Sequence, residues 1–218
     1  MNKQVIDLRS DTVTLPSSEM LEAIKTINLG DDVFSEDPTV NRLQEKAATL
    51  MGKEEAILVP SGTMGNLASI LTHCARGDEI ILGDQSHTFL YEAGGISAFG
   101  GIHSRQLKNY PDGTIKLDDI KNSIREENVH FPPTTLICLE STHNRCFGAP
   151  LSIEYMNQVS QIAKDNNCKV HLDGARIFNA AVALDVDVHH LVSCVDSMTF
   201  CLSKGLSSPV GSIICGSH

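Results

Sequence analysis

The reactive residues of this sequence centre on one lysine and one aspartate. Lys204 stands between the small residues Ser203 and Gly205, which leave its amine room to react. A lysine amine that is shielded from water can condense with the aldehyde of a cofactor. Asp173 follows an apolar run. If the aldehyde cofactor contains a pyridine ring, a carboxylate at this place would keep the ring nitrogen protonated. Each residue alone also has an ordinary explanation, a solvated lysine or a helix cap.

A turn rich in hydroxyl groups and two histidines add to this pair. Ser61, Gly62 and Thr63 precede a segment of helical period, so N–H groups at a helix N-terminus would be available to a phosphate. A plain turn in which Ser or Thr caps the helix is the commoner use of these residue types. His87 and His143 each follow an apolar run, where a single histidine is more often a capping or surface residue than a catalyst. Two of them at neighbouring strand ends favour the catalytic interpretation.

The elements that must position these residues alternate between short apolar runs and longer helical segments. This alternation predicts an α/β fold with a mostly parallel, seven-stranded sheet and helices on both faces. The predicted strands are Ala56–Val59, Glu79–Leu82, Gly101–Leu107, Thr134–Leu139, Lys169–Leu172, Ser197–Leu202 and Gly211–Cys215. The predicted helices are Ser18–Ile27, Pro38–Met51, Met64–His73, Leu117–Glu127 and Ile153–Asn166. Ligands bind beyond the carboxyl ends of strands in open sheets of this kind, and every reactive residue named above follows a strand.

Five motifs combine these residues with an acidic N-terminal region. They are Asp7-Leu8-Arg9-Ser10-Asp11-Thr12-Val13-Thr14, Gly30-Asp31-Asp32-Val33-Phe34 with Glu36-Asp37-Pro38-Thr39, Ser61-Gly62-Thr63-Met64-Gly65-Asn66, His171-Leu172-Asp173-Gly174-Ala175-Arg176 and Ser203-Lys204-Gly205. With these motifs the sequence resembles the low-specificity L-threonine aldolases, which depend on pyridoxal 5'-phosphate (PLP) and have an aspartate-aminotransferase-like fold. The resemblance extends from about Asp7 to Gly216, and the combination of motifs is highly specific.

The resemblance implies a role toward PLP for several positions. Ser61, Gly62 and Thr63 would bind the phosphate. The other positions would surround the ring: His87 would stack on it, Asp173 would pair with its nitrogen, Arg176 would lie near its phenolic oxygen and Lys204 would form the Schiff base.

The resemblance also implies an amino-acid substrate and a reaction. Ser10 and Arg176 would bind the substrate, Ser10 near its carboxylate, and His143 would line the β-carbon side. The implied reaction is a retro-aldol cleavage of L-threonine or L-allo-threonine to glycine and acetaldehyde, which belongs to threonine catabolism and glycine formation. His87, or His143 with a water molecule, is our hypothesis for the base that takes the β-hydroxyl proton.

The domain organisation expected from the resemblance has two parts. Residues 1–35 would form an N-terminal arm, and residues 36–218 would form the PLP-binding large domain. Threonine aldolases normally continue into a smaller C-terminal domain that supplies an arginine for the substrate carboxylate. The sequence contains no counterpart of that domain, so we expect it to be absent. The family places its active site between subunits, which implies a homodimer or homotetramer.

Two other interpretations stay open. The chain could be a different PLP lyase or transferase of the same fold, such as a β-eliminating lyase or a desulfurase. It could also be a truncated or degenerate PLP-binding relative with little turnover. The presence of Lys204, Asp173 and His87 argues against degeneration, whereas the missing C-terminal region argues for it.

Composition narrows the remaining function classes. The 218 residues carry a net charge of -10 and no long basic run, which disfavours nucleic acid or an anionic membrane as a partner. The apolar runs all fall short of the ~20 residues that a membrane span needs. The seven cysteines form no Cys-x-x-Cys pair, and we expect buried free thiols in a reducing compartment, the cytoplasm. We expect no metal site, because the spacing of the remaining candidate cluster matches no metal motif: Asp185, Asp187, His189 and His190.

Overall fold

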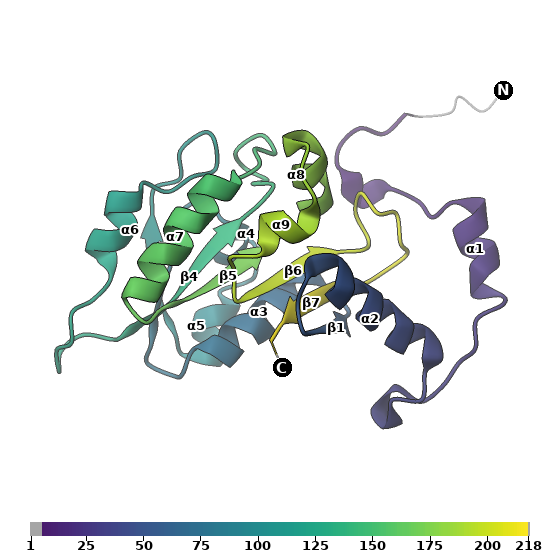
Figure 1. Cartoon of the computed structure of the whole chain (residues 1–218), viewed down its shortest axis with the longest axis horizontal. Helices are drawn as coiled ribbons and strands as arrows, with labels where there is room; N and C mark the ends of the chain where they lie inside the picture. The colour runs from purple at the N-terminus through teal and green to yellow at the C-terminus, as the bar shows by residue number, and fades with distance from the viewer. Residues whose placement is uncertain (1–5, 218) are drawn as a thin grey trace.

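A seven-stranded sheet runs through the centre of the computed structural model, which describes residues 6–217 (Figure 1). The strand order is β1-β7-β6-β5-β4-β2-β3. The strands are β1 (Glu55–Val59), β2 (Glu79–Gly83), β3 (His103–Leu107), β4 (Thr134–Glu140), β5 (Lys169–Asp173), β6 (Ser197–Cys201) and β7 (Ser212–Gly216). Strands β2 to β6 pair in parallel, and β7 is antiparallel to both of its neighbours, β1 and β6. The predicted seven-stranded, mostly parallel sheet is confirmed.

The central strands are buried along most of their length because helices cover both faces of the sheet. Every residue of β2 and β6 is buried, and β3 at the sheet edge contains no fully buried residue. The predicted strand Gly101–Leu107 begins two residues too early. Gly101 adopts φ +61° and terminates the preceding helix, so extended backbone starts only at His103.

The helices divide between the two faces of the sheet. Residues from one set of helices belong to the larger hydrophobic core: α2 (Pro38–Met51), α6 (Leu117–Ser123), α7 (Ile153–Asp165), α8 (Ile177–Leu184) and α9 (Val188–Val192). Residues of α3 (Gly62–His73) and α5 (Gly95–Gly100) form the second core on the other face, and α4 (His87–Leu90) contacts α3. This placement, visible in Figure 1, confirms helices on both faces.

The predicted helix bounds differ from the observed ones at several ends. Helix α2 has the bounds expected, and α7 is one residue shorter. Helix α6 ends at Ser123 rather than Glu127, because the backbone of Ile124 is extended. The short helices α4, α5, α8 and α9 were not predicted, since four to eight residues give too little periodicity to detect. Within residues 6–217, none of the helices has the length and apolar character that crossing a bilayer requires.

The N-terminal segment extends to one side of the sheet (Figure 1). It contains the 3-10 turns η1 (Asp11–Val13) and η2 (Asp32–Phe34) and the helix α1 (Ser18–Ile24), which is three residues shorter than predicted. None of the residues 6–35 is buried. Residues 1–5 of the predicted arm and His218 at the end of the predicted large domain lie outside the described residues.

Candidate active site

The two residues that prompted the chemical interpretation follow neighbouring parallel strands. Asp173 ends β5, and its register partner in β6 is Thr199. The chain continues past β6 to Lys204, which is partly buried, and the hydroxyl of Thr14 donates a hydrogen bond to the Lys204 carbonyl at 2.7 Å. Asp173 and Lys204 therefore lie at the same carboxyl edge of the sheet, as the sequence predicted.

One imidazole and two carboxylates lie close together at this edge of the sheet, and we call this group, His87, Glu92 and Asp173, the floor of the site. The ligand atoms of His87, Glu92 and Asp173 all lie within 4.8 Å of one another. His87 Nδ1 is 2.9 Å from Glu92 Oε1, and both carboxylates are buried. Asn66 Nδ2 donates to Glu92 Oε1 and to Asp173 Oδ2, in each case at 2.9 Å. Among residues 6–217 this is the set that gathers closely enough to share one cation.

The environment of His87 favours its protonated form. The hydrogen bond to Glu92 raises the pKa of His87, against the lowering effect of burial, and Asp173 adds to the increase. Because the partner of Nδ1 is a carboxylate, Nδ1 carries a hydrogen and Nε2 is the nitrogen that gains or loses the second proton. His87 can therefore exchange a proton at Nε2.

A third carboxyl group, Glu140, lies behind His87 at the end of β4. Its side chain accepts hydrogen bonds from the backbone N–H of His87 at 2.7 Å and of Asn144 at 2.9 Å. Burial, together with the nearby charge of Asp173, raises the pKa of Glu140 to about 7. Glu140 therefore changes its charge near neutral pH.

His143 is buried without any hydrogen bond to either ring nitrogen within the described residues. Its side chain is 1% exposed, and Nε2 is 3.9 Å from Glu140 Oε2, beyond hydrogen-bond distance. Burial lowers the pKa of His143, so the ring is neutral near pH 7. A buried polar group of this kind is costly unless a ligand or water satisfies it.

The turn that the sequence predicted to bind a phosphate leads directly into α3. Ser61 caps the helix by accepting a hydrogen bond from the Met64 N–H at 3.2 Å, so the helix begins at Gly62 rather than at the predicted Met64. A Cβ at Gly62 would lie 3.1 Å from Cys201 Sγ, so the backbone approaches β6 closely here. The free N–H groups of the first turn, next to Thr63, suit an anion.

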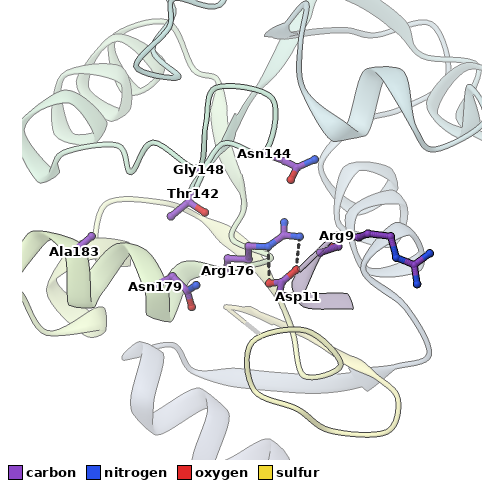
Figure 2. Close-up of a pocket in the computed structure, with 9 residues that line it drawn as sticks. Arg9, Asp11, Thr142, Asn144, Gly148, Arg176, Asn179 and Ala183 are labelled. Carbon is purple, nitrogen blue, oxygen red and sulfur yellow. Dashed lines mark hydrogen bonds and ion pairs between the residues drawn. The ribbon is translucent and has the colours of Figure 1, made fainter. Parts of the chain in front are cut away.

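Ser10 and Arg176 line a pocket of about 480 Å³. Thr142, Asn144 and Asn179 also line it, and Figure 2 shows them around Arg176. The guanidinium of Arg176 does not stand free in this pocket. It donates two hydrogen bonds of 2.7 Å to the Asp11 carboxylate, which Figure 2 shows as a bidentate pair. Arg176 therefore joins the N-terminal segment to α8, and its predicted place beside a cofactor oxygen stays a prediction.

Three residues of this site were not among those predicted from the sequence. Asn66 belongs to the Ser61–Asn66 motif but was given no role, and Glu92 and Glu140 carry no spacing signal, because all three reach the site through contacts between distant segments. Position at a strand end could have marked Glu140, whereas Glu92 lies in the connection between α4 and α5.

The cysteines are the free thiols that the sequence predicted, and the histidine-rich segment lies around α9. All seven cysteines are free, and six of them are buried. In the segment considered for metal, Asp185 follows the last residue of α8 in the left-handed region and Asp187 precedes α9, while the rings of His189 and His190 stack at 5.4 Å.

Comparisons with known proteins agree with this geometry. A low-specificity L-threonine aldolase of Arabidopsis thaliana is 53% identical over 98% of this chain and 60% of its own length. The low specificity L-threonine aldolase of Escherichia coli strain K12 is 47% identical over 98% of this chain and 63% of its own length. The chain thus spans about three fifths of the length of these relatives.

A solved structure and a family description complete the comparison. The threonine aldolase of Leishmania major superposes with a TM-score of 0.79 at 18% identity, over 94% of this chain and 60% of that one, and so shares the fold. The family described as beta-eliminating lyase matches residues 7–218. The resemblance stated from the motifs is confirmed, and the chain belongs to the beta-eliminating lyase family.

Proposed function

We propose that this chain is the PLP-binding part of an aldehyde-lyase that cleaves L-threonine or L-allo-threonine to glycine and acetaldehyde. The observation that carries the proposal is the carboxyl edge itself, where the acids and imidazole of the floor lie beside the strand that leads to Lys204. The relatives named as threonine aldolases support the same reaction class.

The residues present fit PLP in charge and shape. The buried carboxylates of Glu92 and Asp173 suit a cationic pyridine nitrogen, and the N-terminus of α3 suits a phosphate. His143 adds an independent observation: within residues 6–217 both of its ring nitrogens are buried without a hydrogen bond, a state that a bound polar ligand or water would satisfy.

Each predicted residue then has a task at the cofactor. Ser61, Gly62 and Thr63 would hold the phosphate, and Lys204 would hold the aldehyde carbon through its amine. The ring would lie against His87, with its nitrogen on Asp173 and its phenolic oxygen near Arg176. PLP, when bound, withdraws electrons from the amino acid so that the Cα–Cβ bond can break.

The chain's own residues supply the proton transfer. His87 Nε2 can take the β-hydroxyl proton, since Nδ1 is committed to Glu92. His143 is neutral and has no hydrogen-bond partner among the described residues, and with a water molecule it is the second candidate for this base. Ser10 and Arg176 would bind the substrate in the pocket that they line, and the ion pair between Arg176 and Asp11 would rearrange to admit it.

The wider setting follows from the same proposal. Residues 1–35 would be an arm and residues 36–218 the large domain, in a homodimer or homotetramer. The reaction would serve threonine catabolism and glycine formation in the cytoplasm, which agrees with the seven free thiols.

Reduction of the PLP-treated protein with borohydride, followed by mapping of the pyridoxyl peptide, tests the proposal. We expect the label on Lys204 and its loss in Lys204→Ala. Lys53 is the matched control, because burial lowers the pKa of its amine, which donates to the Val195 carbonyl at the opposite edge of the sheet, before β6 begins. A label on Lys53, or labels spread over many lysines, would contradict the proposal.

Product analysis separates the aldolase from other lyases of the fold. We expect acetaldehyde and glycine from L-threonine or L-allo-threonine, and no sulfur release from L-cysteine. Sulfur release without acetaldehyde would favour the desulfurase instead.

A further inference from the structure

A buried amide connects the groups on the floor of the site. The Asn66 side chain lies in α3 and is 1% exposed, and all of its hydrogen-bonding capacity is used. Its Nδ2 donates to Asp173 and Glu92. Its Oδ1 accepts from the Thr199 hydroxyl at 2.6 Å and lies 3.1 Å from His171 Nε2.

The partners of Asn66 fix the direction of its amide. If the amide were reversed, its oxygen would face two carboxylates, and repulsion would replace two charge-assisted hydrogen bonds. Since Oδ1 can only accept, His171 Nε2 must carry a hydrogen. The amide therefore stays in one orientation as long as Asp173 and Glu92 are ionised.

The state of His171 is fixed in turn by its burial. The ring is fully buried, and desolvation lowers the pKa of His171 to about 3, so at neutral pH it holds one hydrogen, on Nε2. Nδ1 then accepts from the Ser197 hydroxyl at 2.8 Å. Ser197 Oγ lies 2.7 Å from His73 Nε2 and accepts from it. A chain of hydrogen bonds therefore connects His73 to Asp173 through Ser197, His171 and Asn66. The donor and the acceptor of each bond in this chain are defined.

We infer that Asn66 is a positioning residue of this site: oriented by His171 and Thr199, its amide holds Asp173 and Glu92 side by side as carboxylates. Through Glu92 it also fixes the hydrogen on His87 Nδ1. The inference rests on the proposed function, because the purpose of the paired carboxylates is to receive a cationic ring.

Two variants and a matched control test this role. Asn66→Ala removes the amide. Thr199→Val keeps the side-chain shape and removes one of the two donors to Asn66 Oδ1. This variant provides the test if Asn66→Ala folds poorly. Ser69→Ala is the control, because Ser69 is a buried polar residue of the same helix whose hydroxyl donates only to the Gly65 carbonyl at 2.8 Å.

The first measurement needs no cofactor. ¹⁵N NMR of the imidazoles reports which ring nitrogen carries the hydrogen. We expect His171 to be neutral with its hydrogen on Nε2 in wild type and in Ser69→Ala, and both tautomers to be populated in Asn66→Ala. A hydrogen on Nδ1 in wild type, or an unchanged spectrum in Asn66→Ala, would overturn the inference.

The second measurement is PLP affinity by equilibrium dialysis. We expect Asn66→Ala to bind PLP about tenfold more weakly or worse, Thr199→Val to lose less, and Ser69→Ala to stay within about twofold of wild type. Equal affinity in Asn66→Ala and Ser69→Ala would overturn the positioning role. Failure of wild type itself to bind PLP would overturn the proposed function, while the NMR result would still decide the role of Asn66.

Discussion

Replacement of Asp11 by Asn should loosen the segment that carries Ser10 while leaving the sheet intact. Asp11 accepts two hydrogen bonds of 2.7 Å from Arg176, and the two side chains are only 23% and 17% exposed. Asn keeps one neutral acceptor and loses the charge, so the free energy that holds this segment closed should fall by about 1–2 kcal/mol. The hydrogen bond from Thr14 to the Lys204 carbonyl remains and limits the effect.

Hydrogen exchange followed by mass spectrometry measures this loss. A change of about 1–2 kcal/mol corresponds to roughly 5- to 30-fold faster exchange of the amides around Val13 and Thr14, whose N–H groups bond within the turn. Unfolding in urea should change by less than about 0.5 kcal/mol, because residues 6–35 include no buried side chain.

Asp7→Asn is the matched control for this prediction. Asp7 pairs with Arg9 in the same segment, but the Arg9 side chain is 81% exposed, and an exposed ion pair adds little to stability. Unchanged exchange in Asp11→Asn, together with a large drop in urea stability, would refute the view that this ion pair is a local tether.

Other variants test the fold and the floor of the site. Glu79→Gln should lower the free energy of unfolding in urea by about 2–4 kcal/mol, because fully buried Glu79 accepts two hydrogen bonds of 3.1 Å from Arg125; a loss below about 1 kcal/mol would contradict this. Glu140 has a folded pKa raised to about 7 from 4.5, so its contribution to stability is fully present below about pH 4.5 and is lost as pH rises through 7. The free energy of unfolding of Glu140→Gln, measured in urea relative to that of wild type, should therefore rise by about 2–3 kcal/mol between pH 4.5 and 8. A difference between variant and wild type that stays constant over this pH range would count against the raised pKa. Asp173→Asn should weaken PLP binding about 30-fold or more in equilibrium dialysis, equivalent to about 2 kcal/mol, and unaltered affinity would remove Asp173 from the site.

The sequence predicted the sheet and its reactive edge because both follow from local patterns. Apolar runs with turn residues after them locate the strands, and in a parallel sheet the residues that follow neighbouring strands must meet. Asp173 and Lys204 could be placed for this reason alone. The same patterns place Ser61 before a helix, although they put the start of that helix two residues late.

The remaining parts of the site depend on contacts that no local pattern encodes. Asp11 and Arg176 are 165 positions apart, and Asn66 and Asp173 are 107 positions apart. Periodicity reports which face of an element is buried but is silent on which buried polar groups become partners. From the sequence, Arg176 was therefore predicted to bind a ligand. The fold shows that its guanidinium binds the carboxylate of Asp11.

The charges of the floor define what kind of ligand this edge can accept. Glu92 and Asp173 share one amide donor, Glu140 stands close enough to feel the charge of Asp173, and burial keeps water from screening the three acids. The carboxylates raise the pKa of His87, and burial together with the charge of Asp173 raises the pKa of Glu140 to about 7, so protonation of these two groups reduces part of this repulsion. An anion placed against these carboxylates would add to the repulsion, whereas a flat cationic ring would relieve it. The same edge offers the N-terminal N–H groups of α3, which suit an anion. A ligand with a cationic ring at one end and a phosphate at the other satisfies both constraints at once, which is why the charge pattern selects PLP among aldehydes that a lysine could capture.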